Sequence, residues 1–158
     1  MSLTIVHGDL LKSDCGIICH QANCQTTMRS GIAKSLVELY PEVAQADKDF
    51  PIPSGDNRRL GRFSHVQTHS GVIVVNLYGQ FYYGTDRQHT DYAALEHAVR
   101  EMLHHLSEFR TQNQKVFKVG LPYNMGCGLA GGDWNVVREF LERASNDYQY
   151  PLFVYRLQ

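Results

Sequence analysis

The chain has 158 residues, a net charge of -1, 43% hydrophobic and 20% charged residues, a composition typical of one globular domain spanning residues 1–158. A net charge this close to zero does not indicate the basic surface that is expected of a nucleic-acid-binding protein. The one candidate for a local basic patch consists of Arg58, Arg59 and Arg62. No run of about 18 apolar residues and no basic-then-apolar leader is present, so we expect no membrane span and a cytoplasmic protein. The 4 cysteines lack paired metal-site spacing and the 8 histidines are scattered, which predicts reduced thiols and no metal.

The first part of the chain predicts two strands and a helix around a polar loop. Leu3 to Val6 forms a short apolar strand, and Gly16 to Ala22 forms a second, buried one. After a polar loop, apolar residues recur with helical spacing from Ser30 or Gly31 to Tyr40. Pro41 ends this helix and opens a further helical turn.

The middle of the chain predicts a hairpin and the longest helix. The pattern predicts two strands, Leu60 to His69 and Val72 to Leu77, joined by a Ser-Gly turn. Strands joined by so short a turn pair in an antiparallel manner. Thr90 is the expected N-cap of a helix whose apolar face extends to Phe109.

The last part of the chain predicts an inner strand, a helix and a closing strand. These are Val116 to Leu121, a helix capped by Asp133, and Leu152 to Leu157. Strands that alternate with helices predict an α/β protein, and the antiparallel hairpin makes its sheet mixed.

Two strand–loop–helix segments carry the polar and glycine residues that suit a ligand. The first leaves the strand ending at Ala22 and enters the helix near Ser30. The second contains Gly126, Gly128, Gly131 and Gly132. Glycine lets backbone N–H groups approach a ligand closely, and a helix N-terminus favours an anion. Two such loops predict a diphosphate ligand, although each alone is equally typical of a turn.

Three side chains are candidates for chemistry, and each has a simpler structural explanation. His20 lies near the end of an apolar strand, where it is either a buried core residue or a group that exchanges a proton near neutral pH. Asn23 offers a donor and acceptors to ribose hydroxyls, or it stabilises a turn. Asp133 is more typical of a helix cap than of a catalytic group.

Several segments, taken in order, resemble the macrodomain family, the ADP-ribose-binding module, and the likeness covers essentially the whole chain. The segments are Gly8-Asp9-Leu10, His20-Gln21-Ala22-Asn23-Cys24, Met28-Arg29-Ser30-Gly31-Ile32-Ala33, Asn76-Leu77-Tyr78-Gly79-Gln80, Gly126-Cys127-Gly128-Leu129-Ala130-Gly131-Gly132-Asp133-Trp134 and the segment around Tyr155. The segments that begin at Asn76 and at Gly126 are most similar to the subgroup that includes ADP-ribose-1''-phosphate phosphatases. This resemblance implies a three-layer α/β/α sandwich with a central mixed sheet.

The resemblance also implies a set of site residues, without a metal or cofactor. In the family, the acidic residue matching Asp9 holds the adenine amino group, the asparagine matching Asn23 contacts the distal ribose, and a tyrosine matching Tyr155 lies near the adenine. The implied ligand-binding residues are Asp9, Leu10, Ala22, Asn23, Arg29, Ser30, Gly31, Ile32, Tyr78, Asn124, Met125, Gly126, Cys127, Gly128, Leu129, Ala130 and Tyr155. The predicted catalytic residues are His20, Asn23 and Asp133.

The chain departs from its relatives at two places. Related terminal ADP-ribose glycohydrolases use a lysine nucleophile near the position of Tyr78 and an aspartate where Ala130 stands, so a lysine adduct is not expected here. Arg29 replaces a usual glycine, and it either crowds the site or presents a charged fork to a phosphate.

The sequence therefore predicts a macrodomain that binds ADP-ribose and hydrolyses ADP-ribose-1''-phosphate to ADP-ribose and phosphate. His20 would act on water or on the leaving oxygen, with backbone amides and Arg29 stabilising charge. Two alternatives stay open: a hydrolase that removes ADP-ribose from modified protein or nucleic acid, and a reader that catalyses nothing. The expected partner is the small-molecule ligand, nucleic acid enters only as a carrier of the modification, and the oligomeric state stays open.

Overall fold

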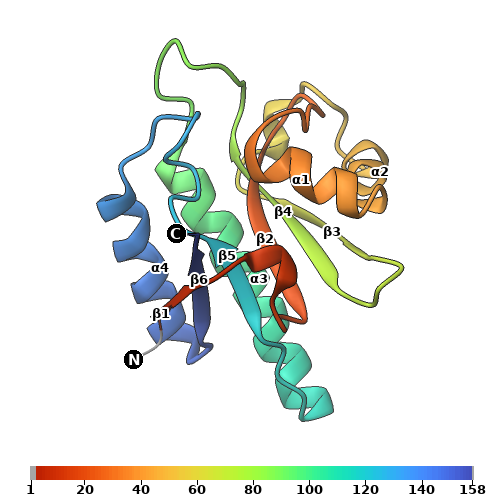
Figure 1. The fold of residues 1–158 in the computed structure, drawn as a ribbon, viewed down its shortest axis with the longest axis vertical. Helices are drawn as coiled ribbons and strands as arrows, with labels where there is room; N and C mark the ends of the chain where they lie inside the picture. Colours follow the sequence, from red (N-terminus) through yellow and green to blue (C-terminus); the bar gives the residue numbers. More distant parts are fainter. Residues whose placement is uncertain (1–2, 158) are drawn as a thin grey trace.

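The computed structural model describes residues 3–157, which form one six-stranded sheet with helices on both faces (Figure 1). The strands are β1 (Leu3–His7), β2 (Ile17–Asn23), β3 (Phe63–Gln67), β4 (Ile73–Gln80), β5 (Val119–Pro122) and β6 (Leu152–Arg156). The helices are α1 (Gly31–Leu39), α2 (Glu42–Asp49), α3 (Tyr92–Asn113) and α4 (Trp134–Tyr148), with 3₁₀ turns η1 (Leu10–Lys12) and η2 (Asn57–Arg59). The predicted α/β/α sandwich is confirmed. No helix within residues 3–157 is long and apolar enough to cross a membrane.

The strand order is β1-β6-β5-β2-β4-β3, and all neighbouring pairs are parallel except β3 and β4. The sheet is therefore mixed, as predicted, with its one antiparallel pair at an edge. Because β2, β4 and β5 run in the same direction, their carboxyl ends meet at one edge of the sheet. The loops that follow these strands lie together at the top of Figure 1.

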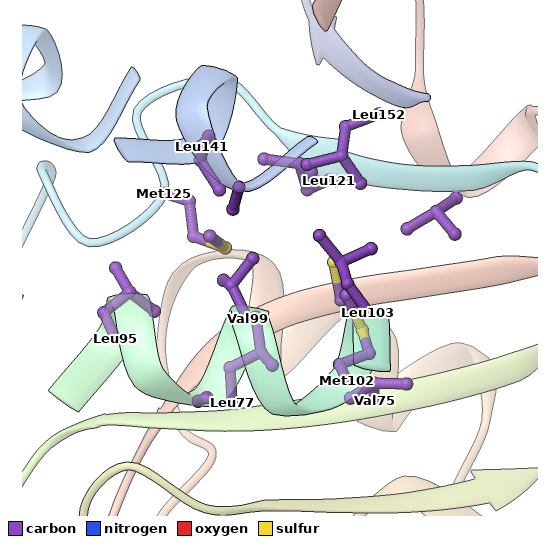
Figure 2. Packing of buried hydrophobic residues seen from close by; sticks show 14 of the residues in the cluster. Val75, Leu77, Leu95, Val99, Met102, Leu103, Leu121, Met125, Leu141 and Leu152 are labelled. Carbon is purple, nitrogen blue, oxygen red and sulfur yellow. The ribbon is translucent and has the colours of Figure 1, made fainter. Parts of the chain in front are cut away.

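The central strand β2 is buried on both faces. Ile17 and Cys19 pack into the cluster under α3 and α4, whereas Ile18 packs with Leu36 of α1 on the other face. Figure 2 shows the larger of these two cores, in which Leu95, Val99, Met102 and Leu103 of α3 face the sheet and α4. A strand in this position needs apolar side chains on both faces, which explains its nearly continuous apolar run.

Several predicted boundaries differ from the structure. β5 begins at Val119 and not at Val116, which is 55% exposed. β3 is shorter than predicted because Leu60 ends the turn η2, whereas β4 continues past Leu77 to Gln80.

The two long helices begin at aspartates. Asp133 caps α4 as predicted, since its carboxylate accepts from the Asn135 N–H at 2.9 Å. The expected cap of α3 was Thr90, but Asp91 takes this place and accepts from the Ala94 N–H at 3.0 Å. Both residue types cap helices well, and the Thr90 hydroxyl is used for a tertiary hydrogen bond instead.

Candidate ligand-binding cleft

A cleft of about 520 Å³ opens at the carboxyl edge of the sheet, where the chain leaves β2, β4 and β5. Half of its lining residues come from two loops: residues 24–30, the first cleft loop, and residues 123–132, the second cleft loop. Gln80 and residues 83–85 complete the rim. A larger, mainly apolar groove of about 970 Å³ lies beside the edge strand β3 and contains none of the predicted site residues.

Asn23 shapes the first cleft loop. Its Nδ2 donates to the Thr27 carbonyl oxygen at 2.9 Å and to Thr27 Oγ1 at 2.8 Å, while its Oδ1 accepts from the Gln25 N–H at 2.8 Å. Both amide hydrogens are thus used inside the loop, although Asn23 also lines the cleft. The side chain acts as a turn former, and its contact with a ribose stays a prediction.

The N-terminus of α1 opens onto the cleft. The first helical hydrogen bond runs from the Lys34 N–H to the Ser30 carbonyl oxygen at 3.3 Å, and the Ser30 side chain makes no capping bond. Residues 30–33 line the cleft, so the N–H groups of the first helical turn are available there. Arg29, directly before this turn, is exposed and also lines the cleft.

The second cleft loop is tied to the rest of the rim by a set of side-chain hydrogen bonds. Thr90 Oγ1 donates to the Gly126 carbonyl oxygen at 2.5 Å. Gln21 of β2 donates from Nε2 to Thr90 Oγ1 at 2.9 Å and to Gln80 Oε1 at 2.7 Å. These bonds join β2, the end of β4 and the second cleft loop into one rim.

The backbone of the second cleft loop leaves several donors open. Within residues 3–157, no protein acceptor takes a hydrogen bond from the N–H groups of Gly126, Gly128, Leu129 and Ala130. Gly126 has a φ of 76°, a conformation that favours glycine, and its carbonyl takes the Thr90 bond. Gly128 lacks a positive φ, and nothing lies within 4 Å of the position a Cβ would occupy there.

The cleft carries one positive charge. Among the described residues that line it, Arg29 is the only charged side chain, and no carboxylate or imidazole is present. Nowhere in residues 3–157 do three His, Cys, Asp or Glu side chains lie close enough together to hold a metal ion. The chemistry available in the cleft is therefore that of backbone donors, amides, hydroxyls and one guanidinium.

His20 lies in the core and does not line this cleft, so its catalytic role stays a prediction that the geometry does not support. The side chain is fully buried, and Nε2 lies 2.7 Å from Asn76 Oδ1. Gln21, the next residue, lines the cleft instead, because side chains alternate between the faces of a strand. Burial lowers the pKa of His20 to about 4, so the imidazole is neutral near pH 7.

The carboxylates of Asp133 and Asp9 also lie outside the cleft lining. Asp133 caps α4, which confirms the simpler interpretation of this residue. Asp9 accepts from the Leu11 N–H at 3.0 Å and caps the turn η1.

Four further predicted side chains, those of Leu10, Tyr155, Tyr78 and Cys127, do not line the cleft. Leu10 and Tyr155 are buried side by side over Gly120, whose missing Cβ leaves room for both. Tyr78 is fully buried, and Cys127 packs against the α3–α4 core. The remaining predicted residues do line the cleft: Ala22, Asn23, Arg29, Ser30, Gly31, Ile32, Asn124, Met125, Gly126, Gly128, Leu129 and Ala130.

Comparison with known proteins defines the family and the fold. No family model matches the chain. It is 30% identical over 152 residues to an uncharacterised 17.5 kDa protein from the tk-vs intergenic region of Enterobacteria phage T4, which covers 92% of each protein. The chain belongs to the family of this phage protein. The structure is also similar to the macrodomain of Mycobacterium tuberculosis DarG, with a TM-score of 0.75 and 22% identity over 97% of this chain and 96% of that one. The chain has the macrodomain fold.

A second structural neighbour of this macrodomain was solved with a ligand. It is Thermosipho africanus DarTG in complex with ADP-ribose, with a TM-score of 0.73 and 16% identity. The similarity covers 97% of the present chain and 41% of that protein.

Sequence reasoning missed the residues that support the cleft of this macrodomain. Gln21 and Thr90 join its rim, but neither was a candidate. The alternation of side chains along β2 was the available signal, because it places Gln21 and Asn23 on one face and His20 on the other. No local signal pointed to Thr90, since its partner lies 36 residues away.

Proposed function

We propose that this macrodomain binds ADP-ribose in the 520 Å³ cleft. The observation that carries the proposal is that the N-terminus of α1, the open N–H groups of the second cleft loop and Arg29 line the same cleft. Backbone donors at a helix N-terminus and a guanidinium fork are suited to a diphosphate. The ADP-ribose complex of a protein with the same fold supports this ligand.

We further propose that the cleft binds this ligand without side-chain acid–base catalysis. Among the described lining residues, the titratable groups are Arg29, Tyr83 and Tyr123, while His20 and Asp133 lie elsewhere. Neither a guanidinium nor a phenol is an ordinary proton donor at neutral pH. A reader of ADP-ribose is therefore better supported than a hydrolase that acts on ADP-ribose-1''-phosphate or on modified protein or nucleic acid.

Thermal unfolding with and without ADP-ribose tests the proposal. At about 100 times its Kd, a ligand adds roughly 2.7 kcal/mol to the free energy of unfolding, which raises the Tm of a domain of this size by about 5–10 °C. AMP, which lacks the second phosphate and the distal ribose, should raise the Tm distinctly less. A Tm that does not move in millimolar ADP-ribose would contradict the proposal. Release of phosphate from ADP-ribose-1''-phosphate by the same protein would instead identify a hydrolase.

The Gly128→Val variant is expected to bind ADP-ribose at least about tenfold more weakly while remaining folded. The new Cβ meets no atom within 4 Å and the position needs no positive φ, but the side chain occupies space in the cleft lining. Titration calorimetry on parent and variant measures the change. Gly71→Val is the matched control, because Gly71 lies in the β3–β4 turn with a φ of 94°. That variant should lose stability and keep its affinity, and equal affinities for parent and Gly128→Val would show that this part of the loop does not meet the ligand.

A further inference from the structure

Arg59 is a buried cation with a buried partner. Its side chain is 1% exposed, and Nη1 lies 2.9 Å from Oδ1 of Asp47 on α2. Its Nη2 also donates to the Asp47 carbonyl oxygen at 3.1 Å. The guanidinium carbon lies 5.3 Å from the ring centroids of both Phe50 and Tyr78. Charged groups are rarely buried without a specific role for their hydrogen bonds.

The Nε group of Arg59 binds the segment that precedes this residue. Nε donates to the Ile52 carbonyl oxygen at 2.7 Å and to the Pro53 carbonyl oxygen at 3.2 Å. We call residues 52–56 the supporting segment. Its sequence, Ile-Pro-Ser-Gly-Asp, contains no helix or strand, and these bonds tie it to a fixed guanidinium.

The supporting segment holds the first cleft loop. The Gly55 N–H donates to the Cys24 carbonyl oxygen at 2.7 Å, and the hydroxyls of Ser54 and Thr26 lie 2.7 Å apart. On its other side, the Cys24 N–H donates to the Phe81 carbonyl oxygen at 3.0 Å. The loop that carries Thr27 and Arg29 into the cleft is thus fixed from behind at Cys24 and at Thr26.

The same ion pair is connected to the strands beneath the cleft. Tyr78 Oη donates to Asp47 Oδ1 at 2.7 Å and lies 2.8 Å from Ser64 Oγ. Asn76 Nδ2 donates to Ser64 Oγ at 3.0 Å, and His20 Nε2 lies 2.7 Å from Asn76 Oδ1. With Nε2 of His20 protonated, every donor in this chain points toward the Asp47 carboxylate. The arrangement aligns β2 with β4 directly below the first cleft loop.

We propose that Arg59 and Asp47 are positioning residues for the ligand cleft, acting through the supporting segment on the first cleft loop. This inference rests on the proposed function, because the expected consequence is tighter binding of ADP-ribose. When only a fraction of the molecules has the loop in its binding conformation, the apparent affinity falls by that fraction. A loop that is held in this conformation before the ligand arrives avoids the loss. If loss of the Arg59 bonds to the supporting segment leaves about one tenth of the molecules with the loop in its binding conformation, the apparent Kd for ADP-ribose rises about tenfold.

The decisive experiment separates positioning from stability. The double variant Asp47→Leu with Arg59→Met replaces the ion pair by apolar groups, and such replacements are often neutral for stability. It removes the hydrogen bonds to Ile52 and Pro53. We expect near-parental unfolding and about tenfold weaker ADP-ribose binding by calorimetry. Arg62→Met is the matched control, because the nearby Arg62 side chain is 49% exposed and pairs with Glu101 of α3, outside the supporting segment. Parental affinity in the stable double variant would overturn the proposal.

A second variant keeps the proposal testable if the double variant does not fold. Arg59→Lys retains a charge for Asp47 but loses the planar fork, and we expect several-fold weaker binding. Hydrogen exchange of the Cys24, Gln25 and Gly55 amides, measured without ligand, should be faster in this variant. Unchanged affinity and unchanged exchange would show that Arg59 does not order the loop. If the parent itself fails to bind ADP-ribose, the proposed function fails, whereas the exchange measurement still decides the role of Arg59.

Discussion

Replacing Asp47 with alanine is expected to lower the free energy of unfolding by about 3–5 kcal/mol. The substitution leaves the Arg59 guanidinium buried without its charge partner and removes the acceptor of the Tyr78 hydroxyl. Burial raises the pKa of Asp47, while hydrogen bonds from Tyr78 and Arg59 oppose that rise. Because domains are stable by only about 5–15 kcal/mol, the loss should be a large part of the total. Urea denaturation of parent and variant measures it through the midpoint and the slope.

The control for this prediction is an ion pair on the surface. Asp147 of α4 accepts from Arg100 Nη1 at 2.8 Å and is 61% exposed. Exposed pairs of this kind contribute about 1 kcal/mol or less, so Asp147→Ala should unfold close to the parent. Similar losses in both variants would mean that the burial of the Asp47–Arg59 pair has no special consequence.

Acidification from pH 7 to pH 4 is expected to destabilise the parent by about 3 kcal/mol more than a His20→Gln variant. Burial lowers the pKa of His20 to about 4 from an ordinary value of 6.5. The unfolded chain therefore takes up a proton as the pH falls through 6.5, whereas the folded protein does so only near pH 4. Stability is lost between these two values, and below them His20 contributes no further change.

The measurement is the free energy of unfolding at several pH values, each protein being referenced to its own value at pH 7. Glutamine can donate to Asn76 Oδ1 but does not titrate in this range, so the difference between the two curves isolates His20. Parallel curves would show that His20 takes up its proton equally well in the folded protein, which is inconsistent with its burial.

The features that were predicted correctly have local causes. Asp133 followed by an amphipathic segment is sufficient to begin α4, because the capping carboxylate and the N–H group that it binds are two residues apart. Pro41 marks the junction of α1 and α2 for a similar reason, since its ring cannot continue the first helix but can begin the second. The two cleft loops were found through their strand–loop–helix pattern.

The expectations that differ from the structure concern residues whose surroundings come from other elements of the fold. His20 lies in an inner strand that is buried on both faces, and the apolar run around it hides the alternation that places Gln21, and not His20, at the cleft. The one candidate for a basic patch, Arg58, Arg59 and Arg62, does not form one. Arg59 is buried by a partner 12 residues away, and Arg62 pairs with Glu101. Contacts of this range leave no trace in the periodicity of the sequence.

The strand order determines how late during synthesis the sheet can form. β6, the last strand of the chain, lies between β1 and β5, and it is the only strand that pairs with β1 in residues 3–157. During synthesis, β1 therefore has no strand to pair with until residues 152–156 have been made. Contacts that span almost the full sequence close slowly because the intervening chain must be ordered first. A truncation that removes residues 152–156 thus deprives the sheet of two strands, since β1 loses its place together with β6.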